Sequence, residues 1–303
     1  MIDRAYLSIN NTCNLHCRYC SFRQTNLITN DEILTESDIN NILRNILDYS
    51  RKNNISLFKL GIVGAGEPFI DFNLIKYIIE YTKSEDVDNI LTFYTITNGT
   101  LINNNLLTHL YENRQLISIN FSLDGYKELH NYGKEAFNKT FDGIKQYEAV
   151  YKEKPVLNCT VSRQTIKNKE AVVNFFVRSG FEKVNFNLLI DVDDRDLIIT
   201  HEEFNNFLKF IKKTNLIVSR QNRKERIYDC LIYGQLCGAG RNNIFITKQG
   251  IYPCCRFYKN ETYKIANMDF DLFEVESNMA KKIKPVKDGE CYYNTHIKNG
   301  SNK

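Results

Sequence analysis

Short apolar runs alternate with amphipathic segments along the first two-thirds of the chain. The runs are rich in β-branched and aromatic residues, which favours strands, and the segments between them have the apolar spacing of helices. Strands are predicted at residues 5–9, 56–63, 90–97, 116–123, 155–161 and 183–190. Helices are predicted at residues 36–52, 72–84, 103–113, 135–152, 166–179 and 201–213.

This alternation predicts βαβ units and therefore a parallel sheet. Six units over residues 1–215 predict an α/β fold, a partial (β/α)6 TIM-like barrel whose functional loops lie at the carboxyl ends of the strands. Local signals mark two helix starts. Thr35, followed by Asp38, is predicted to cap one helix, and Pro68 and Asp71 precede another.

The pattern changes beyond residue 215, where the helical period fades and Cys and Gly become dense. Residues 243–247 and 251–253 predict a hairpin that turns at residues 248–250. We therefore expect a small Cys-rich second domain over residues 216–303.

Composition excludes several classes of protein. Hydrophobic residues make up 43% of the 303-residue chain, and the net charge of +4 is too small to indicate a nucleic-acid partner. No apolar run reaches the roughly 20 residues of a membrane span, and the N-terminus lacks a signal-peptide core, so we expect no membrane partner and a cytoplasmic location. In a reducing compartment, nine cysteines indicate metal binding rather than disulfides. Cys159 stands apart from the others and is expected to be a buried small hydrophobe.

Cys13, Cys17 and Cys20 form a Cys-x3-Cys-x2-Cys run directly after the first predicted strand. Three thiolates this close can bind three corners of a four-iron cube, and they leave the fourth iron without a protein ligand. That iron is then open to a small molecule. The alternative is a zinc site in which His16 supplies the fourth ligand, although its place between two cysteines would strain a tetrahedral arrangement.

The spacing of these cysteines resembles that of the radical S-adenosylmethionine (radical SAM) family, in which the amine and carboxylate of SAM occupy the open iron. The resemblance implies a [4Fe-4S] cluster, SAM, and an external electron donor such as flavodoxin or ferredoxin. One electron given to the SAM sulfonium yields methionine and a 5′-deoxyadenosyl radical, which abstracts a substrate hydrogen.

The segment Gly64-Ala65-Gly66-Glu67-Pro68 follows the second predicted strand. Glycines let a backbone approach a ligand closely, and Glu67 offers a carboxylate to an ammonium, although an ordinary strand-to-helix turn has the same composition. The segment is similar to the Gly-Gly-Glu-Pro motif of radical SAM enzymes. That resemblance implies that Gly64, Ala65, Gly66 and Glu67 bind the amino group of SAM.

Polar residues also end the third and fourth strands, where the ribose of SAM would need partners; they include Asn98 and Ser122. Ser122-Leu-Asp124-Gly followed by His130 resembles the peptide-modifying branch of the family, which includes anaerobic sulfatase maturases. The resemblance implies Ser122 near the ribose, and Asp124 and His130 in or around the active-site mouth. A turn-capping Asp124 and a buried structural His130 are the alternatives. That branch usually continues with a charged segment that includes an Arg, and because this chain has Asn131-Tyr-Gly-Lys134 there, no role is assigned to that stretch.

A second set of thiols follows residue 215, and four of them could close a cube or hold a structural zinc ion. The order Cys-Gly, hairpin Gly, Tyr-Pro-Cys resembles the auxiliary-cluster (SPASM) domain of radical SAM proteins, here in its shortened, one-cluster "twitch" form. The resemblance implies one auxiliary [4Fe-4S] cluster for electron transfer or scaffolding. Its implied ligands are Cys230, Cys237, Cys254 and Cys291.

Cys255 follows an implied cluster ligand directly, and the choice of Cys254 over Cys255 as that ligand rests on the family register. A thiol at this place that points into a cavity could donate a hydrogen atom to a substrate radical, and some radical SAM epimerases resemble this chain in having such a Cys-Cys pair. The alternative is that Cys255 packs under the cluster.

The motifs therefore predict an enzyme that abstracts a hydrogen from a ribosomally made peptide and gives an epimerised or crosslinked residue. Many such maturases have an N-terminal leader-binding domain, whereas this chain starts at the first barrel strand, so any leader recognition is expected to need a separate leader-binding protein or the barrel surface itself. An aminosugar or cyclitol epimerase or dehydrogenase is the alternative. A protein without catalytic activity, such as an iron–sulfur electron carrier or a metal-stabilised binding module, is a third alternative.

Overall fold

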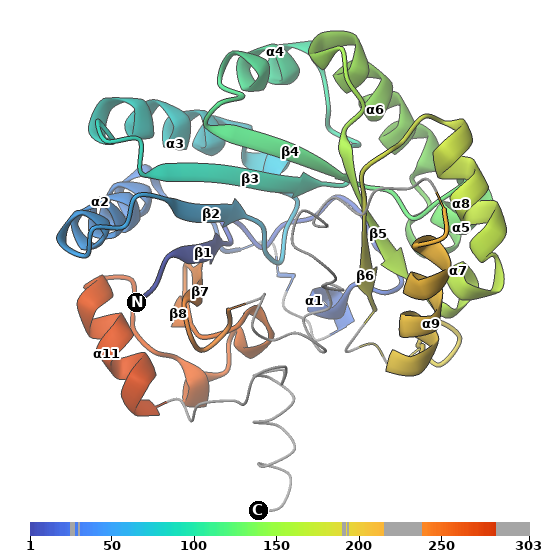
Figure 1. Cartoon of the computed structure of the whole chain (residues 1–303). Coiled ribbons are helices and arrows are strands. Elements are labelled where there is room, and N and C mark those ends of the chain that lie inside the picture. The colour runs from blue at the N-terminus through green and yellow to red at the C-terminus, as the bar shows by residue number, and fades with distance from the viewer. Residues whose placement is uncertain (25–27, 30, 190–191, 193, 215–237, 283–303) are drawn as a thin grey trace, which may run out of the picture.

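The computed structural model of the protein describes residues 1–24, 28–29, 31–189, 192, 194–214 and 238–282. Its strands are β1 (Arg4–Leu7), β2 (Phe58–Ile62), β3 (Leu91–Thr97), β4 (Ile117–Ser122), β5 (Val156–Val161), β6 (Val184–Leu188), β7 (Asn243–Thr247) and β8 (Gly250–Tyr252). They form one curved sheet in the order β6-β5-β4-β3-β2-β1-β7-β8 (Figure 1). All neighbouring strands are parallel except β7 and β8, which form an antiparallel hairpin.

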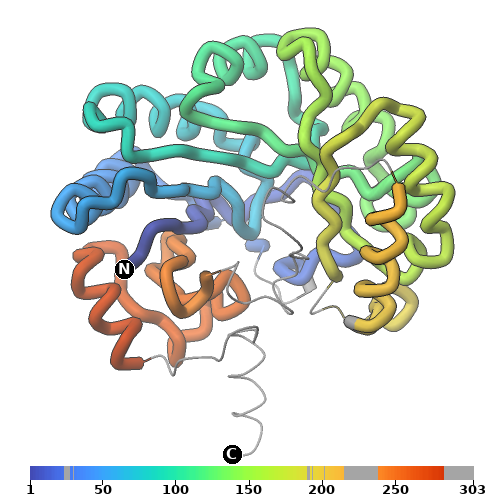
Figure 2. Tube along the Cα trace, in the orientation of Figure 1, coloured from blue at the N-terminus to red at the C-terminus, as the bar shows by residue number. Residues whose placement is uncertain are grey.

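Helices connect the parallel strands and lie along the outer side of the curved sheet (Figure 2). The α-helices are α1 (Ser21–Gln24), α2 (Glu36–Lys52), α3 (Phe72–Glu85), α4 (Asn104–Glu112), α5 (Lys127–Lys134), α6 (Phe137–Tyr151), α7 (Arg163–Lys167), α8 (Lys169–Arg178), α9 (His201–Ile211) and α11 (Leu272–Lys282). Short 3-10 helices span Pro68–Asp71, Cys255–Phe257 and Glu261–Tyr263. Among the residues described, no helix is long and apolar enough to cross a membrane.

The predicted partial barrel is confirmed, and all six predicted strands are present. The predicted helix over residues 166–179 is instead two helices, α7 and α8. Asn168 separates them as the C-cap of α7 and the N-cap of α8. Helix α5 was not predicted. Its eight residues are short for a periodicity argument and include Gly133, which has low helix propensity.

The N-terminus of α2 has the cap that the sequence predicts. The Thr35 side chain accepts from the N–H of Asp38, and the Asp38 carboxylate accepts from the N–H of Thr35 at 2.7 Å, which completes a capping box. The same carboxylate lies 2.6 Å from Lys248 Nζ in the hairpin turn. The cap therefore also links α2 to the turn between β7 and β8.

The hairpin differs from its prediction in register and in its partner. Thr247 pairs with Gly250, so the turn is Lys248-Gln249 and the second strand begins at Gly250. Strand β7 also pairs in parallel with β1, which makes the hairpin a continuation of the barrel sheet. The sequence could not show this pairing, because it joins residues far apart in the chain.

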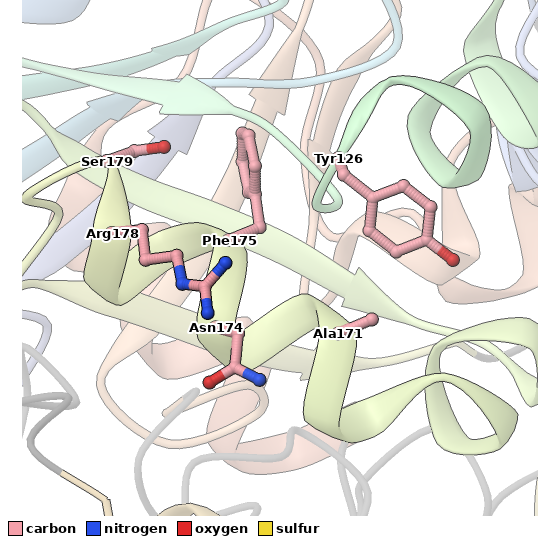
Figure 3. A pocket seen from close by; sticks show the side chains of 6 residues that line it. All are labelled: Tyr126, Ala171, Asn174, Phe175, Arg178 and Ser179. Carbon is pink, nitrogen blue, oxygen red and sulfur yellow. The ribbon is translucent and has the colours of Figure 1, made fainter.

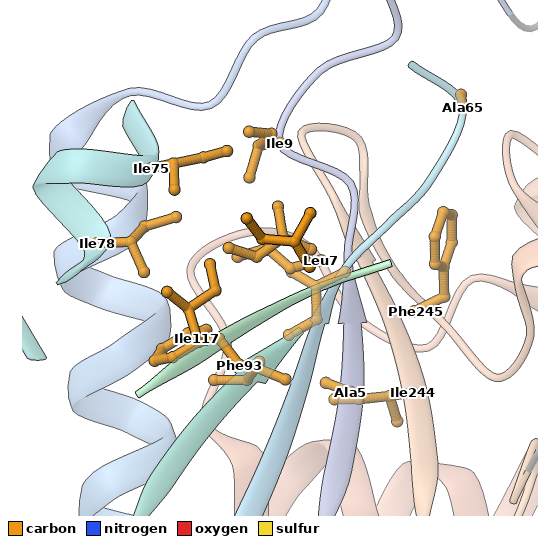
Figure 4. Close-up of a cluster of buried hydrophobic side chains, with 14 of the residues drawn as sticks. Ala5, Leu7, Ile9, Ala65, Ile75, Ile78, Phe93, Ile117, Ile244 and Phe245 are labelled. Carbon is orange, nitrogen blue, oxygen red and sulfur yellow. The ribbon is translucent and has the colours of Figure 1, made fainter. Parts of the chain in front are cut away.

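The two ends of the described chain share one hydrophobic core. Ala5 and Leu7 of β1 pair with Ile244 and Ile246 of β7, and each of these side chains is no more than 1% exposed (Figure 4). Burial of such apolar surface contributes about 25 cal/mol per Å². The core therefore fixes the hairpin against β1, whose carboxyl end leads into the first cysteine run.

Candidate active site

The loop after β1 carries the first three cysteines, and we call residues 8–20 the cysteine loop. Cys13, Cys17 and Cys20 are half-buried, and the N–H of Cys20 donates to the carbonyl of Cys17 at 3.1 Å, which closes a turn. Burial raises the pKa of the Cys17 thiol to about 12, and the ammonium of Lys134 lowers it in part. Cys13 and Cys20 each contribute a smaller increase, so the three thiols are electrostatic neighbours.

The sequence implies that these three thiols bind an iron–sulfur cluster, and the alternative is a single zinc ion. Within the described ranges, no three His, Cys, Asp or Glu side chains converge on a point that could hold one metal ion, and His16 is exposed. Ligands of a single zinc ion all lie within about 2.3 Å of it and must converge, whereas thiolates on one cube bind different irons. Soft thiolates also suit an iron–sulfur cluster. The donor set of these three thiols therefore fits an iron–sulfur cluster.

The loop after β2 is bonded to the cysteine loop and to the end of β3 through Glu67. This residue is 3% exposed, and its carboxylate accepts from Thr97 Oγ1 at 2.7 Å and from the N–H of Asn98 at 2.8 Å. The main-chain N–H of Glu67 donates to Thr12 O at 2.7 Å. Burial raises the pKa of the Glu67 carboxyl, and the bonds from Asn98 and Thr97 oppose that rise. Glu67 therefore links three loops, with its carboxylate bonded to the end of β3 and its main-chain N–H bonded to the cysteine loop.

The two glycines before Glu67 are needed for close approach to the cysteine loop itself. A Cβ on Gly66 would lie 1.7 Å from Asn10 Oδ1, and one on Gly64 would lie 2.0 Å from Ser8 Oγ. Ala65 between them is buried, and its N–H donates to Ser8 Oγ at 3.2 Å. In the structure the glycines approach residues 8 and 10 of the protein itself, whereas the sequence predicted close approach to a ligand.

Asn98 links the end of β3 to the same loop. Its side chain donates to Asn14 Oδ1 at 2.9 Å and accepts from the N–H of Thr100 at 2.9 Å. The side chain of Asn14 in turn donates to Thr100 Oγ1 at 2.8 Å. The strand ends of β1, β2 and β3 therefore meet around the cysteines.

A buried polar cluster, here called the Asp124 network, closes the other side of the cysteine loop. Asp124 is 4% exposed, its Oδ1 accepts from the N–H of Thr160 at 2.9 Å, and its Oδ2 accepts from the hydroxyl of Tyr19. Oδ2 also forms an ion pair with Lys134 Nζ at 3.4 Å. The members of the network are Tyr19, Ser122, Asp124, His130, Lys134 and Thr160.

Lys134, Tyr19 and Thr160 were not among the predicted site residues. Lys134 donates to Ser122 Oγ at 2.6 Å, so the side chain of Ser122 is bonded within the network. One signal for Lys134 was present in the sequence, because residues four apart lie on one helix face and His130 precedes it by that interval. Tyr19 lies in the cysteine loop and Thr160 lies on β5, and their contacts with Asp124 depend on tertiary packing that the sequence does not show.

His130 lies beneath Asp124 and is fully buried. Its Nδ1 accepts from the N–H of Asp124 at 3.2 Å, its Nε2 has no hydrogen-bond partner among the described residues, and its ring contacts Phe137. Burial, aided by the charge of Lys134, lowers the pKa of His130 to about 4. The neutral ring is thus a support for the strand end that carries Asp124.

The second cysteine region is described only in part. Cys254 is buried and Cys255 is half-buried at the start of the 3-10 helix Cys255–Phe257, while Cys230, Cys237 and Cys291 lie outside the described residues. The guanidinium of Arg256 donates to Ser21 Oγ, directly after Cys20. The residue that follows Cys255 is therefore linked to the residue that follows Cys20.

A surface pocket of about 490 Å³ lies on a different part of the fold (Figure 3). It is lined mainly by α8, including Phe175 and Arg178, with Tyr126 from the segment before α5. None of its lining residues belongs to the cysteine loop or the Asp124 network.

Comparison with known proteins gives a family and a fold. Residues 7–202 match the model of the radical SAM superfamily. An uncharacterized protein of Methanocaldococcus jannaschii is 26% identical over 260 residues, which span 82% of this chain and 83% of that protein. The cyclopropyl synthase TigE of Paramaledivibacter caminithermalis is 26% identical over 54% of this chain, which spans only 36% of the length of TigE.

The fold resembles that of anSMEcpe solved with bound AdoMet and the Kp18Cys peptide. The TM-score is 0.74 at 18% identity, over 92% of this chain and 82% of that one. The family match covers the cysteine loop, the Glu67 loop and the Asp124 network, which the structure brings together. The chain belongs to the radical SAM superfamily of enzymes.

Proposed function

We propose that this enzyme uses SAM to abstract a hydrogen from a peptide and that it gives an epimerised or crosslinked residue. The observation that carries the proposal is the convergence of three strand ends on Cys13, Cys17 and Cys20, through Glu67 and Asn98. Peptide as the substrate is supported by the fold shared with anSMEcpe, which was solved with a bound peptide. Small aminosugars or cyclitols are the alternative substrates.

In this proposal Cys13, Cys17 and Cys20 hold a [4Fe-4S] cluster, and the surrounding loops bind SAM. Gly64, Ala65, Gly66 and Glu67 form one wall, and Asn98 and Ser122 supply polar groups toward the ribose. When bound, the cluster supplies one electron from a donor such as flavodoxin or ferredoxin to the sulfonium of SAM, which gives methionine and the radical that removes a substrate hydrogen. Burial of Glu67 and Asp124 gives these walls fixed geometry.

Cys255 is proposed as the hydrogen donor of an epimerisation. Its bond to hydrogen breaks, the hydrogen atom goes to the substrate radical from the opposite face, and the remaining thiyl radical takes one electron and one proton. Cys230, Cys237, Cys254 and Cys291 are the proposed ligands of an auxiliary cluster, which would supply this electron from the external donor. The bond from Arg256 to Ser21 supports the role proposed for Cys255, because it links the residue after Cys255 to the residue after Cys20.

The test is mass spectrometry of a peptide encoded beside the gene, after anaerobic reaction with reconstituted enzyme, SAM and reductant in D2O. Epimerisation predicts a gain of about one mass unit at one Cα, which the Cys255→Ala variant loses. A loss of about two mass units indicates a crosslink or dehydrogenation and removes the role of Cys255. An unmodified peptide together with released 5′-deoxyadenosine contradicts the peptide substrate and favours a small molecule. Absence of 5′-deoxyadenosine contradicts the radical chemistry itself.

A further inference from the structure

A buried lysine lies beside the cysteine loop. Lys134 is 7% exposed, and no other lysine or arginine in the described part of the chain is buried. Its Nζ lies 2.6 Å from Ser122 Oγ, 3.4 Å from Asp124 Oδ2 and 5.6 Å from the centre of the Tyr19 ring. Since a buried charge is stable only with such compensating contacts, its position is well defined.

The helix end that carries Lys134 packs directly on the turn between Cys17 and Cys20. The N–H of Arg18 donates to Gly133 O at 2.8 Å. A Cβ on Gly133 would lie 2.4 Å from Cε1 of Tyr19, so this residue must be glycine for the ring to lie where it does. The charge of Lys134 is thus held at a fixed place relative to Cys17.

Lys134 and Asp124 carry opposite charges beside the turn between Cys17 and Cys20. The ring of Tyr19, in that turn, lies 5.6 Å from Lys134 Nζ, and its hydroxyl donates to Asp124 Oδ2. Tyr19 and Thr160 donate to the carboxylate and further spread its charge. In a buried environment such fixed charges interact more strongly than they would in water. Lys134 therefore contributes a positive field at the ligand loop, and the carboxylate of Asp124 offsets part of it.

We propose that Lys134 is a positioning residue that raises the reduction potential of the cluster held by Cys13, Cys17 and Cys20, and that Asp124 sets the size of this effect. The inference rests on the ligand assignment proposed above and not on the substrate. Reduction adds one electron to the cluster, and a nearby positive charge stabilises the more negative state. Net charge around a cluster is one of the factors that set its potential.

The test is a potentiometric titration of the reconstituted enzyme without SAM, followed by electron paramagnetic resonance of the reduced [4Fe-4S] signal. Lys134→Met is expected to decrease the equilibrium constant for reduction about tenfold, which is about 59 mV for one electron. Asp124→Asn is expected to increase it, and Lys134→Arg to restore most of the wild-type value. Lys145→Met is the matched control, because Lys145 is a largely exposed lysine on α6.

Lys134→Met and Asp124→Asn disturb the same network, so a structural disturbance is expected to shift the reduction potential in the same direction in both variants. Shifts in opposite directions therefore indicate an effect of charge. Equal potentials for wild type, Lys134→Met and Asp124→Asn, at matched iron content, would overturn the inference. A shift of both variants in the same direction would overturn it as well. If Lys134→Met does not retain a cluster, the reduction potentials of Asp124→Asn and Lys134→Arg still test the inference. A wild-type protein that binds no cluster at these cysteines contradicts the ligand assignment instead.

Discussion

Two buried acidic residues, Glu67 and Asp124, connect the cysteine loop to the neighbouring strands. Glu67 and Asp124 are each less than 5% exposed, and each accepts hydrogen bonds from the end of a neighbouring strand and contacts the cysteine loop or its side chains. A buried carboxylate without partners would cost several kcal/mol, so these bonds are required for folding as well as for the geometry of the site. The identities of Glu67 and Asp124 were predicted from motifs. Their partners were not, because Thr97 and Thr160 are distant in sequence.

His130 gives a prediction about pH. Its pKa is about 4 in the folded protein, below the value of about 6.5 in an unfolded chain, so the unfolded state binds more protons between these values. Stability is therefore expected to fall as the pH drops from about 6.5 toward about 4, by up to about 3 kcal/mol from this residue. The groups that face it are Asp124, Lys134 and the ring of Phe137.

The measurement is urea unfolding of wild type and His130→Asn at several pH values. Asparagine can still accept from the N–H of Asp124 and does not titrate. The variant is expected to lose less stability on acidification than wild type, whatever its stability at pH 7. Parallel losses in the two proteins would show that His130 is not buried in its neutral form.

At the level of elements, the segment before α2 and the segment after β8 form a polar latch. Glu32 is 8% exposed, and its carboxylate accepts from the hydroxyl of Tyr258 and pairs with Lys259 Nζ at 2.7 Å. The main chain of Lys259 has a φ of 60°, a left-handed conformation that side chains rarely adopt. The Glu32 carboxylate offsets this strain and helps to hold the 3-10 helix that begins at Cys255.

Tyr258→Phe tests the latch. Removal of the hydroxyl leaves Glu32 with one donor fewer in a buried place, and we expect a loss of about 1–3 kcal/mol in unfolding free energy. Hydrogen exchange of residues 253–260 should increase more than that of β3. Tyr81→Phe, on α3 and away from the latch, is the control. Unchanged exchange of residues 253–260 in Tyr258→Phe would mean that the hydrophobic core alone holds this segment.

The elements also show what the sequence could predict. Helix α2 was predicted over its full length, because its apolar period and its Thr35 cap are local. The break at Asn168 and helix α5 were missed, since short helices give a weak periodic signal. The partner of β7 could not be predicted, because strand pairing across the chain depends on tertiary packing.

For the whole molecule, the structure joins the beginning of the chain to its Cys-rich part in one sheet. The edge of β1 that faces away from β2 is covered by β7, and Ile244 and Phe245 fill the adjacent core. A chain of residues 1–215 is therefore expected to expose a strand edge and an apolar surface, and to aggregate. Size-exclusion chromatography of this truncation and of the full chain is the measurement. A monomeric, cooperatively unfolding truncation would show that the barrel is an independent domain.

The position of β1 between β2 and β7 has a consequence for the order of events during synthesis. Strand β1 can pair with β2 early, but its other edge stays open until residues 243–247 have been made. Contacts of such large sequence separation form late and slow the folding of a chain. During that interval the cysteine loop has neither the hairpin nor the segment around Arg256 beside it. The thiols of Cys13, Cys17 and Cys20 are therefore expected to be most accessible on the nascent chain, before the last strand closes the sheet.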